Sequence, residues 1–478
     1  MKKGLKVFKT LCLSLVLGVA CFSLTSCKSE VKDSAHTIVF YNTMGDKLQA
    51  PLASAISAFE TKFPGWKVES VQPGGYDEVK SKVISDLSAG TQPDLAYCYA
   101  DHVAQYIPSG KVVNMSTFIN NSSKLTTTVK EGDEFVEKTY DEIVGYTAEE
   151  IADFVPGYYA EGYARNYAKY ADYGFQEDNM LTMPFQKSTE ILYYNENALI
   201  ELGEVDEEGN VIVPDNWDDL WRVCIAAKAK WSNCVPLGYD SESNWFITTC
   251  EQYGWGYTSA SDNHYLFNNE NAKAWLGQLQ TYYSQGLFTT AEIYESYTSN
   301  LFTKGVAEGG TLFTIGSSGG ASYQATDKFK WGVAPIPGAK LEDGTISRAA
   351  ISQGPSLVML KTSASNNEEK QLMTWEFVKI LLDPVYQCKF AGTSGYMPSR
   401  QSAYDVPEYQ DLLSDTSNIV VATVLCAKEM NDIYFTSPAF NGSSNAREQV
   451  GTAIIYVVTG VKTPAQALSD AYKRCGGK

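Results

Sequence analysis

Two features of the sequence have the chemistry to bind an oxyanion. Residues 316–320, Gly-Ser-Ser-Gly-Gly, follow an apolar strand-like run and precede a segment that we expect to be helical. Such a turn presents unpaired backbone N–H groups and the positive end of a helix dipole, which both favour a negative group. Arg447 adds a planar guanidinium that can donate two parallel hydrogen bonds to a phosphate. Ser317 and Arg447 are therefore candidate anion ligands.

Each feature also has a simpler interpretation. A glycine and serine turn often caps a helix that binds no ligand. Arg447 could instead form a surface salt bridge, for instance to Glu448 or Asp432. The sequence alone leaves both interpretations open.

Acidic pairs in the chain are not arranged for catalysis. Asp218 and Asp219, like Glu149 and Glu150, are adjacent at expected helix starts, where neighbouring side chains point apart. A glycosidase needs two carboxylates that face each other across the substrate. The sequence contains neither HExxH nor a phosphate-binding GKT or GKS motif. We expect a protein that is not an enzyme and that has no cofactor and no metal site.

The elements that position these groups begin with an alternation of strands and helices. Strand patterns occupy residues 37–41, 68–71 and 93–98, and helical patterns occupy 51–63 and 76–87. This order predicts a parallel sheet with covering helices.

Similar patterns continue to the end of the chain. Further strands are expected at 181–185, 190–195, 311–315, 331–337 and 355–360, and further helices at 197–202, 214–230, 271–285, 297–304, 368–382, 385–390, 447–458 and 464–473. Residues 120–179 are acidic and weakly patterned, so we expect them to decorate the first domain, with the tyrosines between 158 and 173 on a covering helix.

The N-terminus has the layout of a lipoprotein signal peptide. A leader with four lysines precedes an apolar block (11–24), and Leu-Thr-Ser-Cys ends at Cys27. Cleavage after residue 26 would make Cys27 the first residue. Each buried methylene of an attached lipid contributes about 0.8 kcal/mol, so two or more acyl chains would anchor the protein. A plain secretory signal is the alternative.

Charge and cysteine content exclude other classes. The formal net charge of -18 becomes -22 without the four leader lysines, and such a surface repels nucleic acid and anionic lipid. Seven cysteines follow Cys27 without CxxC spacing, which argues against zinc and against complete disulfide pairing. Cys224 and Cys234 are the first pair to test.

The length beyond the leader exceeds the roughly 250 to 300 residues of one core, so we expect two domains.

Several short runs closely resemble the extracellular solute-binding proteins of ABC importers, the group that includes the maltose-binding type. The resemblance covers nearly the whole mature chain and is nearest to the glycerol-3-phosphate-binding component. The runs that carry it are 183–189 (MPFQKST), 193–195 (YYN), 316–319 (GSSG), 354–357 (GPSL), 393–398 (TSGYMP) and 462–468 (KTPAQAL).

The resemblance implies an α/β fold of two lobes that close over a ligand like a hinged trap. With hinge crossovers near 183, 315 and 361, residues 36–183 plus 315–361 form the N-terminal lobe and 184–314 plus 362–478 the C-terminal lobe. They follow a signal peptide (1–26) and a lipidated tether (27–35). The family's ligand-binding positions correspond to Tyr76, Ser188, Ser317, Gly354, Tyr396 and Arg447.

Two positions depart from the family pattern. Where the family has a glutamate that accepts hydrogen bonds from glycerol hydroxyls, the chain offers Asp101 one residue late. Lys187 adds a cation beside Ser188, either to reinforce phosphate binding or to face solvent. Trp245 and Trp255 could wall the cleft, since polyol faces pack on indole rings, or pack in the core.

The sequence thus predicts a lipid-anchored periplasmic or cell-surface protein that captures a polyol phosphate for a separate permease and ATPase. Its expected site comprises Tyr76, Asp101, Ser188, Trp245, Ser317, Gly354, Tyr396 and Arg447. We expect a monomer that binds no nucleic acid and contacts the membrane only through its anchor. A binding protein for a neutral sugar or oligosaccharide is the nearer alternative. A purely structural surface lipoprotein is the more distant one.

Overall fold

The computed structural model describes residues 35–261, 263–362 and 366–477. The expected signal peptide, Cys27 and all of the tether except its last residue lie outside the described residues. None of the helices in these ranges has the length and apolar character required to cross a bilayer.

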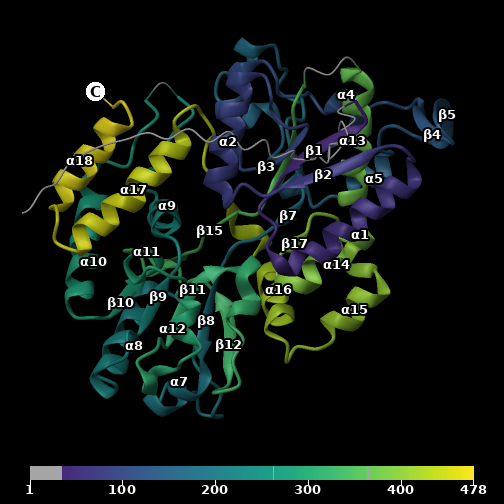
Figure 1. Cartoon of the computed structure of the whole chain (residues 1–478). Helices are drawn as coiled ribbons and strands as arrows, with labels where there is room; N and C mark the ends of the chain where they lie inside the picture. Colours follow the sequence, from purple (N-terminus) through teal and green to yellow (C-terminus); the bar gives the residue numbers. More distant parts are fainter. Residues whose placement is uncertain (1–34, 262, 363–365, 478) are drawn as a thin grey trace, which may run out of the picture. The chain divides into compact units, whose positions relative to one another are not determined.

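The first sheet contains the strands expected near the N-terminus. Its order is β2-β1-β3-β16-β6, with β16 antiparallel to β3 and β6. Strand β1 is parallel to β2 and β3, and Figure 1 labels these three strands. The strands are β1 (Thr37–Tyr41), β2 (Lys67–Val71), β3 (Leu95–Cys98), β6 (Met183–Pro184) and β16 (Ser356–Met359). The expected parallel arrangement of the first three strands is confirmed.

The helices between these strands also follow the sequence pattern. Helix α1 (Asp46–Lys62) joins β1 to β2, and α2 (Tyr76–Ala89) joins β2 to β3. Helix α2 ends at Gly90, whose φ of 77° is the left-handed conformation that glycine adopts without a Cβ clash. Helix α3 (Ala100–Tyr106) starts two residues after β3.

A second sheet forms around the middle of the chain. Its order is β10-β9-β11-β8-β12, with β8 antiparallel to both β11 and β12. Its strands are β8 (Glu190–Asn195), β9 (Leu237–Tyr239), β10 (Phe288–Thr290), β11 (Phe313–Ser317) and β12 (Trp331–Pro335). The longer helices associated with this half are α7 (Glu196–Leu202), α8 (Trp217–Lys230), α9 (Glu242–Tyr253), α10 (Glu270–Ser284), α16 (Ile419–Glu429), α17 (Ser443–Val458) and α18 (Pro464–Arg474).

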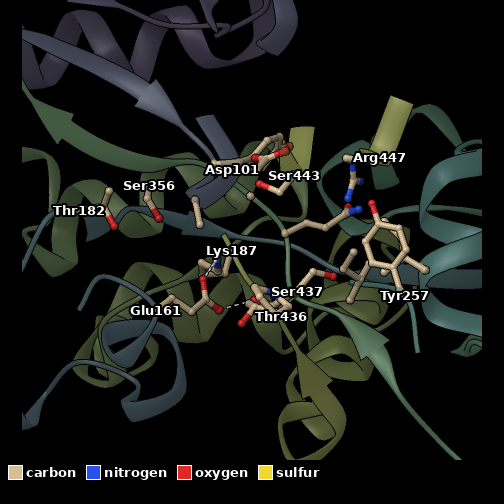
Figure 2. A pocket seen from close by; sticks show the side chains of 18 residues that line it. Asp101, Glu161, Thr182, Lys187, Tyr257, Ser356, Thr436, Ser437, Ser443 and Arg447 are labelled. Carbon is tan, nitrogen blue, oxygen red and sulfur yellow. Dashed lines mark hydrogen bonds and ion pairs between the residues drawn. The ribbon is translucent and has the colours of Figure 1, made fainter. Parts of the chain in front are cut away.

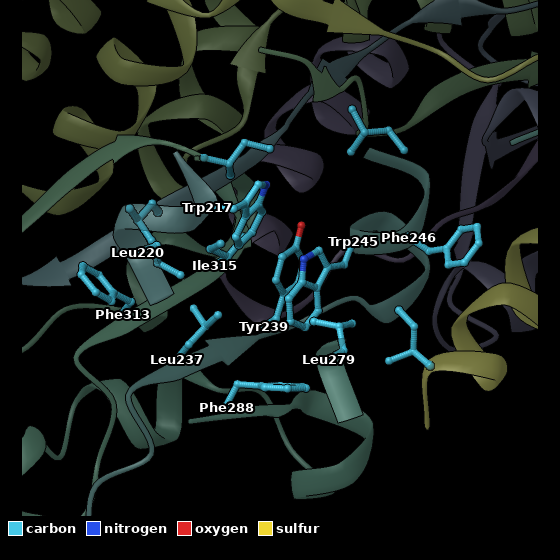
Figure 3. Close-up of a cluster of buried hydrophobic side chains, with 14 of the residues drawn as sticks. Trp217, Leu220, Leu237, Tyr239, Trp245, Phe246, Leu279, Phe288, Phe313 and Ile315 are labelled. Carbon is cyan, nitrogen blue, oxygen red and sulfur yellow. The ribbon is translucent and has the colours of Figure 1, made fainter. Parts of the chain in front are cut away.

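Separate apolar clusters pack against the two sheets. Clusters on the two faces of the first sheet include Phe40 and Tyr41, which are neighbours on β1 and point to opposite faces. The cluster of the second sheet contains Trp217, Tyr239 and Trp245 (Figure 3). The chain therefore builds two cores, as its length suggests.

Strand pairing differs from the expected lobe boundaries. We expected residues 315–361 to belong to the first lobe. Strands β11 and β12 instead join the second sheet, and from that span only β16 joins the first sheet. Helix α13 (Asn367–Leu381) packs on the first sheet, where the Phe377 ring lies 6.0 Å from that of Phe40, although 362–478 were assigned to the second lobe. The chain passes between the sheets after β6 and again before β16, because pairing partners distant in sequence select each strand's sheet.

Short paired segments lie where the chain passes between the sheets. Strand β7 (Gln186–Lys187) pairs with β17 (Met397–Pro398), and Ser188 forms an antiparallel bridge with Gln353. Strand β15 (Ala350–Ile351) pairs with β18 (Tyr434–Phe435). Between α13 and β17 lies α14 (Pro384–Ser394). The shorter elements are α4 (Ser116–Ile119), α5 (Ala148–Ala152), α6 (Pro156–Ala160), α11 (Ala291–Tyr294), α12 (Ser299–Phe302), α15 (Pro407–Leu413), β13 (Ala339–Lys340) and β14 (Ile346–Ser347).

Residues 120–179 are more regular than expected at one end and less regular at the other. A hairpin of β4 (Lys124–Glu131) and β5 (Glu134–Ile143) places Leu125 and Val129 in the first core. The expected tyrosine-rich covering helix is wrong. Helix α6 ends at Ala160, and only short 3₁₀ turns follow, because Tyr158, Tyr159 and Tyr167 each join a different apolar cluster.

All seven cysteines after Cys27 are free thiols. Cys224 and Cys234, the pair singled out from the sequence, are both buried and do not form a disulfide. Cys224 is a buried residue of α8, and the Cys234 thiol contacts the carbonyl oxygen of Ala227 on the same helix. These cysteines act as small apolar residues of the second core.

Candidate functional site

A cavity lies at the ends of elements from both cores (Figure 2). Its wall includes the turn from β3 into α3, the segment from β15 to β16, the residues after β18, and side chains of α9 and α17. The hollow spans about 790 Å³ of space, open solvent included. Groups drawn from both cores can thus contact one ligand.

Three of the residues selected from the sequence line this cavity. They are Asp101 at the start of α3, Gly354 just before β16, and Arg447 in α17. Gly354 has φ 89°, and a Cβ there would lie 2.1 Å from the carbonyl oxygen of Gln186. Glycine at this position is required by both the backbone conformation and the close approach of β7.

Arg447 keeps its charge uncompensated by any direct ion pair among the described residues. Its Nη2 donates to the side-chain oxygen of Asn244, and the salt bridges to Glu448 or Asp432 considered above do not form. Ser443, the first residue of α17, also lines the cavity, so the positive end of this helix dipole lies there too. This region of the wall has the electrostatics of an anion site.

Tyr257 supplies a hydroxyl beside Arg447. Its side chain is 8% exposed and lines the cavity, and its hydroxyl has no hydrogen-bond partner in the described part of the chain. Burial raises the pKa of Tyr257 well above its usual value, so the hydroxyl stays protonated and can donate. Figure 2 shows Arg447 and Tyr257 at the same end of the cavity. A buried polar group without a partner is costly, which favours a ligand at this position.

Asp101 lies next to a buried histidine. The Oδ1 atom of Asp101 is 3.9 Å from Nε2 of His102. Burial lowers the pKa of His102, so at neutral pH the imidazole does not provide a cation for this carboxylate. Asp101 is therefore available to accept hydrogen bonds from ligand hydroxyls.

Tyr76, Tyr396 and Ser317 lie together beside the cavity. The hydroxyls of Tyr76 and Tyr396 are 3.5 Å apart, and the Tyr76 ring stacks at 4.5 Å on Tyr99, which lines the cavity. The Ser317 hydroxyl accepts a hydrogen bond from the backbone N–H of Gly319, and a Cβ on Gly319 would lie 2.7 Å from the Tyr396 ring. Tyr99 thus connects this group to the cavity.

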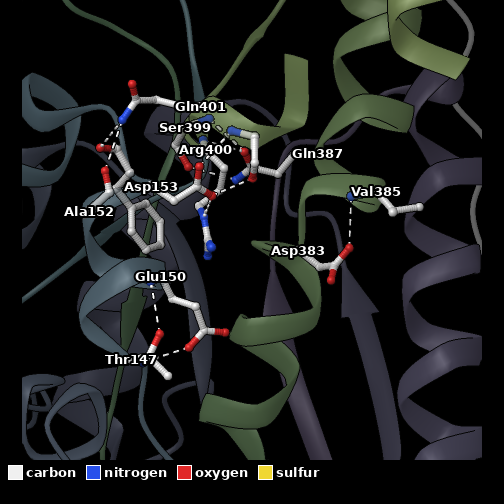
Figure 4. A network of polar contacts seen from close by, with 12 residues as sticks. Thr147, Glu150, Ala152, Asp153, Asp383, Val385, Gln387, Ser399, Arg400 and Gln401 are labelled. Atoms are coloured by element: carbon white, nitrogen blue, oxygen red, sulfur yellow. Dashed lines mark hydrogen bonds and ion pairs between the residues drawn. The ribbon is translucent and has the colours of Figure 1, made fainter. Parts of the chain in front are cut away.

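A polar network holds the segment that follows Tyr396 (Figure 4). Gln387 on α14 accepts from the backbone N–H of Ser399 at 2.7 Å, and its amide nitrogen donates to the Ser399 hydroxyl at 2.8 Å. The neighbouring Arg400 donates from Nε to Asp153 at 2.6 Å. These contacts are largely buried, so they fix the backbone on which Tyr396 is presented.

The other two selected residues, Ser188 and Trp245, are buried and, like Tyr76, Ser317 and Tyr396, do not line the cavity. Ser188 is 3% exposed, and its backbone pairs with Gln353. Trp245 is 1% exposed and stacks on Tyr239 at 4.6 Å in the second core (Figure 3), so it does not wall the cleft. Trp245 lies on α9 and packs among apolar side chains of the second core. Trp255, the other tryptophan considered, stacks on Tyr253.

Residues 316–320 also fit the Gly-x-Ser-x-Gly spacing of serine hydrolases, with Ser318 in the nucleophile position. Ser318 is fully buried, and its hydroxyl accepts from the backbone N–H of Thr189 at 3.3 Å. It lies in a 3₁₀ helix rather than at an exposed strand-to-helix turn. This geometry does not present a nucleophile.

A buried ion pair in the wall was not identified from the sequence. Lys187 is 2% exposed, and its Nζ lies 2.6 Å from Glu161 Oε2, while Ser352 donates to Glu161 Oε1 at 2.6 Å. Lys187 therefore neither faces solvent nor contributes an unpaired cation. Its partner is 26 residues away along the chain, and no local pattern indicated the pairing.

Glu190 is the first residue of β8, and it is buried on the far side of Asn244 from Arg447. Its Oε1 accepts from Asn244 at 3.0 Å and its Oε2 accepts from the Tyr239 hydroxyl at 2.7 Å. Burial raises the pKa of Glu190 to about 7, although these hydrogen bonds and Arg447 act in the opposite direction.

This raised pKa predicts a pH-dependent stability. The folded protein holds the Glu190 proton more tightly than the unfolded protein does, so binding of this proton stabilises the fold. That stabilisation is complete below the ordinary glutamate pKa and is lost as the pH rises through 7. From pH 5 to 8, wild type should lose roughly 3 kcal/mol relative to Glu190→Gln. Urea unfolding of both proteins across this range measures the difference. Glu270→Gln, at an exposed glutamate, keeps Glu190 and should therefore lose stability in parallel with wild type over this range.

Comparison with known proteins gives a family and a fold. The model of the family described as bacterial extracellular solute-binding protein matches residues 54–413. The sn-glycerol-3-phosphate-binding periplasmic protein UgpB of Escherichia coli (strain K12) is 23% identical over 449 residues, which cover 92% of this chain and 91% of that protein.

Two solved structures have a similar fold. UgpB from Mycobacterium tuberculosis, in complex with glycerophosphocholine, superposes with a TM-score of 0.68 and 16% identity, covering 92% of this chain and 97% of that one. The GacH receptor of Streptomyces glaucescens, studied unliganded and with acarbose, gives 0.68 and 17%, covering 92% and 99%. The expected α/β fold of the maltose-binding type is confirmed.

Proposed function

The chain belongs to the family of bacterial extracellular solute-binding proteins, and we propose that it captures a small polyol phosphate for an ABC importer. Candidate ligands are sn-glycerol 3-phosphate and glycerophosphodiesters. The chain would deliver its ligand to a separate permease and ATPase and would catalyse no reaction.

One observation carries the choice of a phosphate: Arg447 faces the cavity without a carboxylate partner within the described ranges. The unpaired Tyr257 hydroxyl and the start of α17 add donors at the same end. Asp101 supplies an acceptor for polyol hydroxyls. The names of the similar proteins, which bind glycerol 3-phosphate and glycerophosphocholine, point in the same direction.

A neutral sugar is the second candidate. The cavity wall includes the rings of Tyr99 and Tyr257, and aromatic faces suit sugar rings. A structurally similar receptor is named for its complex with acarbose. This candidate leaves the charge of Arg447 without a ligand group to contact, so we rank it second.

Calorimetry on the mature chain tests the choice. We expect sn-glycerol 3-phosphate or a glycerophosphodiester to bind near micromolar affinity, which corresponds to about -8 kcal/mol, while glycerol and maltose bind far more weakly. The affinity for inorganic phosphate, measured in the same way, reports recognition of the anion without the polyol. Tight binding of maltose without binding of any phosphate ester would reject the proposal in favour of the sugar candidate.

The two-lobe division with ligand-driven closure is also part of the proposal. Ligand contacts drawn from both cores should stabilise the closed arrangement, because a ligand shifts a conformational equilibrium by its differential affinity for the two states. Small-angle scattering should show a smaller radius of gyration after saturating ligand is added. An unchanged radius with proven binding would contradict closure.

We further propose that the mature protein is held at the outer face of a membrane through lipidated Cys27. Expression of the full chain should place it in the membrane fraction, and Cys27→Ser should release it or leave it unprocessed. Labelling with a palmitate analogue provides the direct measurement. Equal labelling of wild type and Cys27→Ser would exclude this anchor.

A further inference from the structure

The guanidinium of Arg447 and the carboxylate of Glu190 are separated by a single amide. Asn244 accepts from Arg447 Nη2 through its side-chain oxygen and donates through its nitrogen to Glu190 Oε1 at 3.0 Å. Asn244 is 3% exposed and Glu190 is 2% exposed, so water does not compete strongly for these bonds. The three groups form a continuous chain from the core to the cavity.

The orientation of the amide follows from the chemistry of Arg447. A guanidinium donates hydrogen bonds and cannot accept them, so the amide oxygen must face Arg447, which leaves the amide nitrogen to donate to Glu190. The other carboxylate oxygen is held by the Tyr239 hydroxyl at 2.7 Å, and the Tyr239 ring stacks on Trp245. The packing of the second core therefore determines where the guanidinium is held.

An amide at this position has an electrostatic consequence. A direct contact between Glu190 and Arg447 would form a neutral, bidentate pair and would occupy the donors that an anion needs. The amide satisfies one guanidinium nitrogen without adding a formal charge. It also keeps the Glu190 carboxyl group and the Arg447 guanidinium apart, so the remaining donors of Arg447 stay available in the cavity.

We propose that Asn244 is a specificity-determining positioning residue: it holds Arg447 at the cavity and separates it from Glu190, so that the site selects an anionic ligand. This inference rests on the proposed function. It adds that anion recognition depends on a residue outside the cavity wall, which acts only through Arg447.

Calorimetry with sn-glycerol 3-phosphate and glycerophosphocholine tests the inference through a set of variants. In Asn244→Asp the new carboxylate pairs with Arg447, and affinity should fall at least ~10-fold, the loss of about one charge-assisted hydrogen bond. In Asn244→Ala the guanidinium can reach Glu190, and affinity should also fall. Adding Glu190→Gln should restore most of the affinity lost by Asn244→Ala but none of that lost by Asn244→Asp.

Controls separate this role from general damage to the fold. Asn418 caps α16 through its side-chain oxygen, a role that aspartate keeps, so Asn418→Asp changes the net charge equally and should bind as wild type does. Thermal unfolding followed by circular dichroism verifies that each variant is folded. If Asn244→Asp does not fold, the comparison of Asn244→Ala with its Glu190→Gln double variant decides the question.

The outcomes distinguish this inference from the proposed function. Wild-type affinity in Asn244→Asp, or an alanine variant that Glu190→Gln fails to rescue, overturns the positioning role and leaves the proposed function intact. Wild-type protein that binds no phosphate ester overturns the proposed function and this inference together.

Discussion

Arg447→Ala is expected to lower the affinity for sn-glycerol 3-phosphate at least ~100-fold, while the protein stays folded. A guanidinium that donates two charge-assisted hydrogen bonds contributes about 1.5 to 3 kcal/mol through each. Isothermal titration calorimetry measures the loss. The side chain is half-buried and its one recorded polar partner among the described residues is Asn244, so stability should change little.

A matched variant removes the same charge elsewhere. Arg222 is 56% exposed on α8 and pairs with Glu204, so Arg222→Ala should bind as wild type does. Arg447→Lys should recover only part of the affinity, because an ammonium group cannot donate in the same planar, bidentate way. Equal affinities of Arg447→Ala and wild type would remove the phosphate assignment.

The second large effect concerns the backbone at Gly354. Gly354→Ala should destabilise the fold by more than ~2 kcal/mol, since a left-handed conformation alone costs roughly 1 to 2 kcal/mol for a residue with a Cβ. The new Cβ would also lie 2.1 Å from the carbonyl oxygen of Gln186, a backbone atom that cannot rotate away. Urea unfolding measures the change in the free energy of unfolding.

Gly320 provides the control for this substitution. A Cβ at Gly320 meets no atom within 4 Å, and the residue has no left-handed φ. Gly320→Ala should therefore leave the stability within about 0.5 kcal/mol of wild type, the usual range for surface changes. If both alanine variants unfold at the same urea concentration, the close approach between β7 and Gly354 has no energetic importance.

Several elements near the N-terminus could be read directly from the sequence. The expected strand 37–41 coincides with β1, and the helix expected at 76–87 corresponds to α2, which ends where Gly90 takes a left-handed conformation. These signals are local, because apolar periodicity and glycine geometry depend on residues a few positions apart. The hairpin of β4 and β5 was missed because its many polar side chains show little apolar alternation.

The candidate site was accessible to sequence reasoning only in part. Arg447, Asp101 and Gly354 were selected on residue type and family resemblance, and the structure brings them to one cavity. Tyr257 gave no such signal, because an isolated tyrosine does not indicate whether its hydroxyl will find a partner. Trp245 was misjudged as a possible cleft wall, since an indole ring is equally suited to a core.

The sequence by itself determined the order of the first strands and helices, the family, and the presence of a cation suited to an anionic ligand. Only the tertiary structure decided that β11 belongs to the second sheet, that Lys187 is neutralised by Glu161, and that Asn244 separates Arg447 from Glu190. Asn244 and Arg447 are 203 positions apart. Which charges remain available to a ligand depends on such distant partners, because a charge is compensated by its neighbours in space and not by those in sequence.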